Sequence, residues 1–191
     1  LLTKVWNAEV TQTFTPGYVS AIQGIVGTNS DFTFYPSPRN QTATQIPPDF
    51  EAQFLQNRSN TALGRVKTSC KAYLVQSLFS ETRVDILNAL AVLQNENCSV
   101  KIILGENAIG AIVTTYFSMS TAVRDMIDRT EFGNVHDKTL TLSYNLNGTN
   151  HGTTWGGSEN FNGTSLRYDE LAFRADDLTF TRAVEQQSER L

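Results

Sequence analysis

The stretch that begins at Cys70 limits the possible folds more than any other part of the chain. Residues 71–79 are apolar enough for a buried strand, and residues 100–104 form a second apolar run that Gly105 ends. Between them Val84, Leu87 and Leu90 recur at helical spacing. A strand, a helix and a strand of this length form a βαβ unit, so we expect two parallel strands in one sheet.

The two cysteines of the chain flank this unit. Cys70 lies just before the first strand and Cys98 just before the second. Parallel neighbours place these positions at the same end of the sheet, which is a suitable geometry for a disulfide if the strands are adjacent. The alternatives are two buried free thiols or a metal site, and two cysteines without nearby histidines favour the metal site least.

The remaining patterns mix both element types. Thr82-x-x-Asp85 resembles a capping box that opens the helix ending near Gln94. We expect further strands at Phe32–Tyr35, Lys138–Tyr144, Thr154–Gly157 and Leu171–Arg174, and further helices at Asp49–Leu55, Ser120–Arg129 and from Asp176 or Asp177 to about Glu189. The class is therefore α/β (α+β), with a mixed β-sheet flanked by helices.

The composition changes along the chain near residue 65. Residues 1–65 hold all five prolines, many Thr, Asn and Gln, and few charges. We interpret residues 1–65 as a connecting arm and residues 66–191 as a folded lobe. Because the chain starts at Leu1 without a methionine or a leader, we expect a processed product or part of a longer one.

The sequence also predicts where the protein acts. With the two cysteines, the glycosylation sequons favour a secreted glycoprotein with a disulfide bond, although no single sequon is specific. The candidate glycosylation sites are Asn40, Asn57, Asn97, Asn147 and Asn162.

Charge and hydropathy exclude other classes. No apolar run approaches the roughly 18 residues of a membrane span. The net charge of −4 and the pI of 5.2 provide no broad basic field for nucleic acid, although a local basic pocket remains compatible with them.

One cluster of residues suits phosphate chemistry. His136 and Lys138 lie two positions apart at the start of a predicted strand, so their side chains point to the same face. The side chain of Asp137, between them, points to the opposite face. Ser158 and Asn160 have the same spacing after a pair of glycines, which allow a close approach of an anion. An imidazole, an ammonium and two neutral polar groups at adjacent strand ends form a site for phosphate, whereas either pair by itself is common.

In these residues the chain resembles the phospholipase D superfamily, whose signature is His-x-Lys, then Gly-Ser-x-Asn, then an acidic residue. Residues 67–191 resemble one whole lobe of its secreted members, and the preceding residues resemble, more weakly, a connection from another lobe. The matching residues are His136-Asp137-Lys138, then Gly157-Ser158-Glu159-Asn160, then Glu170.

The resemblance implies a role for each residue. His136 is either the nucleophile that forms a phosphohistidine or the acid that protonates the leaving alcohol. Lys138 and Asn160 hold the non-bridging oxygens, and Glu170 fixes the imidazole tautomer. Ser158 belongs to the catalytic set or only holds the turn. No metal or cofactor is implied.

Two residues beside the motif are candidate substrate-binding residues, and two others depart from it. Trp155 and Gly157 are the candidates that line the substrate site, although a Trp at this place also suits packing against the sheet. Ser143 stands where the family has an aspartate, which places activity in question. His151 lies in a longer spacer around an Asn147-Gly148 turn, and we interpret it as exposed loop.

The single His-x-Lys motif predicts an incomplete site. By resemblance, a second lobe of the same product or an identical chain in a homodimer supplies the other histidine. The expected function is a secreted phospholipase D-like phosphodiesterase, a hydrolase that degrades lipid. The alternatives are a nuclease of the same superfamily and a non-catalytic structural or binding protein.

Overall fold

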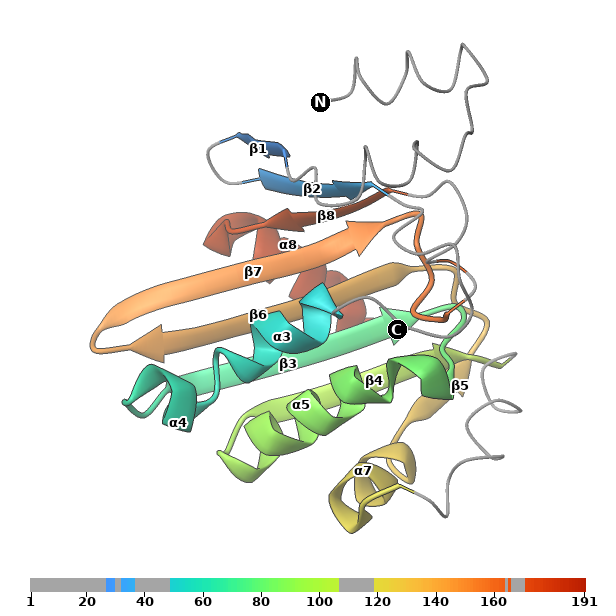
Figure 1. The fold of residues 1–191 in the computed structure, drawn as a ribbon, viewed down its shortest axis with the longest axis horizontal. Helices are drawn as coiled ribbons and strands as arrows, with labels where there is room; N and C mark the ends of the chain where they lie inside the picture. Colours follow the sequence, from blue (N-terminus) through green and yellow to red (C-terminus); the bar gives the residue numbers. More distant parts are fainter. Residues whose placement is uncertain (1–26, 30–31, 37–48, 107–118, 164, 166–170) are drawn as a thin grey trace, which may run out of the picture.

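The described part of the chain forms one mixed eight-stranded sheet with helices on both faces (Figure 1). The structure is a computed structural model, and it describes residues 27–29, 32–36, 49–106, 119–163, 165 and 171–191. The strand order is β1-β2-β8-β7-β6-β3-β4-β5. The strands are β1 (Gly27–Asn29), β2 (Phe32–Pro36), β3 (Thr68–Gln76), β4 (Ser99–Gly105), β5 (Glu131–Gly133), β6 (Lys138–Leu146), β7 (Thr149–Gly157) and β8 (Leu171–Ala175). The helices are α3 (Phe50–Gln56), α4 (Asn60–Leu63), the 3-10 turn η1 (Glu81–Arg83), α5 (Val84–Asn95), α7 (Thr121–Ile127) and α8 (Leu178–Ser188). The predicted class is confirmed.

The βαβ unit is confirmed, and so is the disulfide. β3 pairs in parallel with β4, and α5 connects them. Cys70 and Cys98 are bonded, with their Cα atoms 4.5 Å apart. The bridge closes the crossover at the end where both strands begin, as adjacent parallel strands require.

The hairpin of β6 and β7 is longer than the sequence predicted. Asn147 and Gly148 have positive φ angles of 53° and 84°, which suit a type I′ turn between antiparallel strands. The ladder therefore continues to the turn, and His151 lies on a strand rather than in a loop. Its exposed ring stacks on Tyr144 of the opposite strand, with 5.0 Å between the centroids.

The two faces of the sheet differ in composition. We call the face covered by α3 and α5 the front face and the face covered by α8 the back face (Figure 1). On β6, Leu140 and Leu142 point to the front face and belong to the main core, whereas Thr139, Thr141 and Ser143 alternate to the back. The main hydrophobic core therefore lies on the front face.

The N-terminal segment contributes to this structure. β2 pairs with β8, and α3 packs against α5, so the predicted strand at Phe32–Tyr35 and the predicted helix at Asp49–Leu55 are both confirmed. The carboxylate of Asp49 caps α3 by accepting a hydrogen bond from the Ala52 backbone N–H at 2.9 Å. A connecting role for residues 1–65 stays a prediction, as does the division at residue 65.

The predicted helix starts have mixed outcomes. Ser120 and Asp177 cap α7 and α8 with their side chains, close to where the sequence placed these helices. The capping box at Thr82 is wrong, because the Thr82 hydroxyl hydrogen-bonds with Ser80 at 2.6 Å and the α5 N-cap, Arg83, makes no side-chain cap. Arg83 instead turns inward to buried carboxylates.

Two surface predictions concern the chain's environment. None of the helices in the described ranges is long and apolar enough to cross a membrane. Of the candidate glycosylation sites, Asn57, Asn97 and Asn147 are exposed, Asn162 is half-buried, and Asn40 lies outside the described residues. Glycosylation and secretion stay predictions.

Candidate active site

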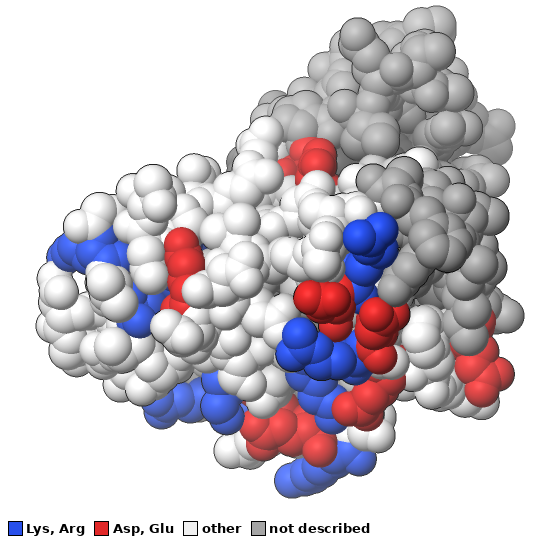
Figure 2. Space-filling model, turned by 90° about the horizontal axis from the view of Figure 1, so that it is seen from below, with Lys and Arg blue, Asp and Glu red and all other residues white. Residues whose placement is uncertain are grey.

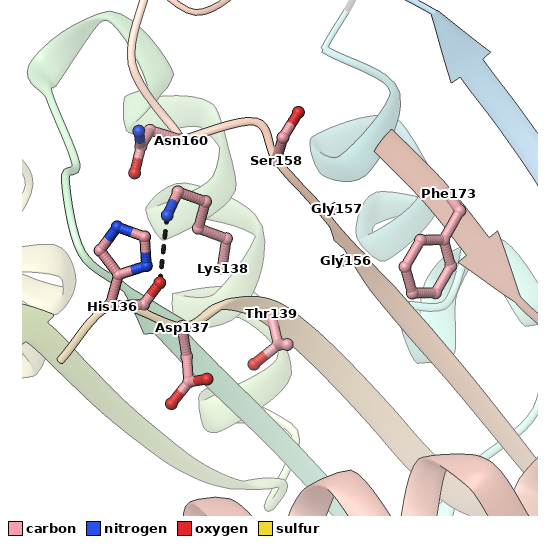
Figure 3. Close-up of a pocket in the computed structure, with 9 residues that line it drawn as sticks. All are labelled: His136, Asp137, Lys138, Thr139, Gly156, Gly157, Ser158, Asn160 and Phe173. Carbon is pink, nitrogen blue, oxygen red and sulfur yellow. Dashed lines mark hydrogen bonds between the residues drawn. The ribbon is translucent and has the colours of Figure 1, made fainter. Parts of the chain in front are cut away.

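An open hollow of about 590 Å³ lies at the end of the sheet where β3 and β7 finish and β6 begins (Figure 3). Ligands of α/β sheets commonly bind outside the carboxyl ends of parallel strands, which is the position of this hollow relative to β3 and β4. The lining residues are His136, Asp137, Lys138, Thr139, Gly156, Gly157, Ser158, Asn160 and Phe173. The structure therefore brings both halves of the sequence cluster together.

His136 and Lys138 enter the hollow from the start of β6. The Lys138 ammonium donates a hydrogen bond to the His136 carbonyl at 3.1 Å. The backbone N–H of Ser77 donates to the Asp137 carbonyl at 3.0 Å, which anchors this segment to the end of β3. In Figure 3 the His136 ring and the Lys138 amine lie on one side, and the Asp137 carboxylate points away, as the alternation predicted.

Asn160 reaches the same side of the hollow from the loop after β7 (Figure 3). Its side-chain oxygen accepts a hydrogen bond from the Ser77 hydroxyl at 2.7 Å, which fixes the orientation of the amide. The sequence did not identify Ser77 as a site residue. No local signal was available, because its partner lies far along the chain and meets it only in the folded sheet.

Ser158 and Gly157 shape the edge of the hollow. The Ser158 N–H donates to the Leu171 carbonyl at 3.0 Å, and its hydroxyl oxygen accepts from the Leu171 N–H at 3.1 Å. Both bonds support the alternative in which Ser158 holds the turn. Gly157 has φ of 143°, and a Cβ there would overlap the Leu171 carbonyl oxygen, so only glycine suits this position.

A buried ion cluster lies next to Asn160. Arg83 is fully buried, and its guanidinium contacts Asp49 at 2.6 Å, Glu51 at 2.9 Å and Glu159 at 3.1 Å. The guanidinium carbon also lies 4.8 Å from the centre of the Phe161 ring. Arg83 thus holds the residues on both sides of Asn160 from within the core.

The cluster shifts the titration of its members. Burial lowers the pKa of Arg83, but the charges of Glu51 and Asp49 outweigh this effect and raise the pKa above its ordinary value. Burial raises the pKa of Asp49, and the Arg83 charge only partly opposes it. The Arg83 guanidinium therefore stays charged, and its positive charge offsets part of the cost of burying the carboxylates.

Gln76 supports the same loop from β3. Its side-chain oxygen accepts a hydrogen bond from the Phe161 N–H at 3.2 Å, and the residue is fully buried. Together with Ser77, this residue fixes the loop to the end of β3. The position of Asn160 is therefore set by buried polar bonds on both sides.

Two residues from the sequence analysis lie away from the hollow. Trp155 does not line the substrate site as predicted, because it is only 2% exposed and packs in the front core, with its ring 4.7 Å from the Tyr35 ring. It points to the front face because its strand partner is Leu140. Ser143 is buried on the back face, away from the hollow. Glu170 lies outside the described residues.

The described residues offer no metal-binding cluster. Within these ranges no three His, Cys, Asp or Glu side chains gather in a way that could hold a metal ion. The groups on the side of His136 are an imidazole, an ammonium and an amide, which suit a phosphate anion, whereas the Asp137 carboxylate points away from them.

Comparisons with known proteins were made at the level of families, sequences and structures. No protein-family model matches the chain, and no curated protein matches it. Among solved structures, it is similar to Nuc from Salmonella typhimurium, a phospholipase D family member, with a TM-score of 0.52 and 15% identity over 83% of this chain and 91% of that one. It is also similar to polyphosphate kinase from Porphyromonas gingivalis, with a TM-score of 0.54 and 15% identity over 93% of this chain and 27% of that one. At this identity the comparisons establish a shared fold.

Proposed function

Because the chain has the phospholipase D-type fold, we propose that it is one lobe of a phosphodiesterase that hydrolyses phospholipid phosphodiester bonds. The observation that supports this most is the meeting of His136, Lys138 and Asn160 at one hollow, although the two motif halves are separate in the sequence. The fold supports phosphodiester hydrolysis in general. We propose in addition that the substrate is a phospholipid.

The proposed reaction has two steps. One histidine attacks phosphorus, and the P–O bond to the alcohol breaks while the opposing histidine protonates the departing oxygen. Water, deprotonated by that second histidine, then attacks the phosphohistidine and breaks its P–N bond. His136 performs one of these roles.

The other residues stabilise charge. Lys138 and the Asn160 amide donate to the non-bridging oxygens, where negative charge is held as five-coordinate phosphorus forms. The Ser77 hydroxyl keeps the Asn160 oxygen occupied, so the amide nitrogen is the group left to donate to the substrate. Glu170 orients the imidazole in this proposal, and Ser158 holds the turn.

The reaction needs a second histidine, so the complete site takes another His-x-Lys motif from a further lobe of the same product or from a second copy of this chain. Specific activity that rises with protein concentration in a dilution series supports the homodimer. Unchanged specific activity in demonstrated monomers of this chain contradicts the requirement for two motifs.

Choline release from phosphatidylcholine tests the function. We expect His136→Ala to lower the rate at least about a thousandfold, as removal of a nucleophile does. His151→Ala is the matched control, because this histidine is exposed on β7 beside Tyr144, away from the hollow. Equal losses in both variants, or none in either, would contradict the assignment.

A single-stranded oligonucleotide assayed in parallel tests the nuclease alternative. The face shown in Figure 2 carries Lys and Arg interspersed with Asp and Glu, and the net charge is −4, so a track for a polyanion is not favoured. Cleavage of the oligonucleotide without choline release would overturn the lipid substrate. Absence of both activities with the partner motif present would favour a non-catalytic protein.

A further inference from the structure

A patch of phenylalanine side chains lies on the back face where β2, β8 and α8 meet. We call it the phenylalanine patch, and its members are Phe32, Phe34, Phe173 and Phe180. Neighbouring ring centroids are 6.3 to 6.5 Å apart. Phe32 and Phe180 are 39% and 37% exposed, and the other two are half-buried. The patch is therefore only partly covered by α8, and its rings remain in contact with solvent.

The patch is continuous with the hollow. Thr139 pairs with Gly156, Gly156 pairs with Phe173, and Phe173 pairs with Phe34, so one row of residues crosses β6, β7, β8 and β2 on one face. Thr139, Gly156 and Phe173 all line the hollow. The hollow and the patch therefore share the Phe173 side chain.

Gly156 allows this continuity. A Cβ at this position would lie 2.9 Å from the tip of the Phe173 ring, so a larger residue would push the ring out of its place. Figure 3 shows the Phe173 ring beside Gly156, on the side of the hollow away from His136 and Lys138. The hollow thus has a polar side for phosphate and an apolar side formed by an aromatic ring.

The ring geometry favours acyl chains over nucleobases. Only the planes of Phe32 and Phe34 are nearly parallel, at 17°, whereas the other three neighbouring pairs are tilted by 47° to 52°. Bases stack on flat, accessible ring faces, whereas tilted rings form an uneven apolar surface that flexible chains can cover. Aromatic residues of this kind also suit the boundary of a lipid aggregate.

We propose that the phenylalanine patch binds the acyl part of a phospholipid at a lipid surface while the phosphate group enters the hollow. The binding of the phosphate group in the hollow rests on the proposed function. The new part of the inference is the surface that binds the acyl chains and so selects a lipid substrate.

Binding to dioleoyl phosphatidylcholine vesicles tests the patch without requiring catalysis. We expect the Phe32→Ala/Phe180→Ala double variant of the full chain to bind vesicles about tenfold more weakly than the wild type, because both exposed rings lose their apolar contact. Phe132→Ala is the matched control, since Phe132 is also 39% exposed but lies on β5 at the other edge of the sheet. Circular dichroism confirms that each variant is folded.

Three outcomes overturn the proposal. They are equal vesicle binding by the wild type and the double variant, an equal loss in Phe132→Ala, and a wild type that does not bind vesicles. A double variant that loses affinity for a single-stranded oligonucleotide but not for vesicles also assigns the patch to bases.

A second comparison separates this proposal from the proposed function. His136→Ala should bind vesicles like the wild type, because it leaves the patch intact. With the partner motif present, the double variant should cleave glycerophosphocholine, which has no acyl chains, at the wild-type rate, and vesicles about tenfold more slowly. With the partner motif present, vesicle binding without any choline release would defeat the proposed function and leave the patch supported.

Discussion

The front and back faces of the sheet are organised by different interactions. On the front face, residues such as Leu74, Leu140 and Trp155 are at most 2% exposed and pack against α3 and α5. On the back face, α8 packs over threonine, serine and tyrosine side chains, and the phenylalanine patch stays partly exposed. The strands are the same in both layers, so the difference comes from the alternation of side chains. The main hydrophobic core therefore lies on the front face, and the phenylalanine patch lies on the back face.

The charged residues show the same contrast. Arg83 on the front is fully buried among three carboxylates, whereas Lys71 on the back pairs with Glu189 while both side chains remain nearly half exposed. When a buried guanidinium is removed, water cannot solvate the carboxylates that it leaves behind in the core. When an exposed ammonium is removed, water solvates its former partner. Substitutions that remove each charge measure the difference directly.

Arg83→Met gives the largest expected effect. Removing the guanidinium withdraws the charge that Asp49, Glu51 and Glu159 all contact, so we expect a loss of about 3–5 kcal/mol in the free energy of unfolding. Urea denaturation followed by circular dichroism measures it.

Lys71→Met is the matched control from the back face. Its partner is exposed, so we expect an unfolding midpoint close to the wild-type value. If the two variants lose similar stability, the contrast between the faces does not hold for charge.

Loss of the disulfide ranks second. Cys70 and Cys98 are 28 positions apart and both belong to the front core, so replacing both with alanine should cost about 2–4 kcal/mol through the greater freedom of the unfolded chain. Urea denaturation of the double variant measures the loss, and reduced wild-type protein should unfold at the same midpoint. A midpoint unchanged by either treatment would show that the front face does not depend on the bridge.

Local patterns predicted most of the elements on both faces. The alternation of Leu140 and Leu142 with Thr139 and Thr141 records which face is buried, and each such pattern is contained within one strand. The same holds for the helix that begins after Asp177, whose side chain accepts a hydrogen bond from the Phe180 N–H at 2.7 Å. The motif residues of the hollow were found because their spacing is also local.

The supports of the site were not predictable in this way. Arg83 meets Asp49 and Glu159 across 34 and 76 positions, and Ser77 meets Asn160 across 83. Only the assembled sheet brings these residues together. At the start of α5, likewise, the N-cap residue Arg83 makes no side-chain cap and instead pairs with carboxylates far along the chain.

The smallest predicted effect concerns two glutamates one turn apart on α8, and their signs are opposite. Burial raises the pKa of Glu185, so the folded protein holds this proton more tightly than the unfolded chain, and stability falls as pH rises above about 4.5. Hydrogen bonds from Lys71 and Tyr73 lower the pKa of Glu189, so its contribution is present at neutral pH and is lost as pH falls. Glu185→Gln should therefore raise the melting temperature at pH 7, by a gain on the order of 1 kcal/mol because a buried charge is removed, and should change little near pH 4. Glu189→Gln should lower the melting temperature at pH 7, and scanning calorimetry of both variants measures these shifts. Shifts in the same direction at pH 7 would show that the back face does not distinguish its buried carboxylate from its exposed one.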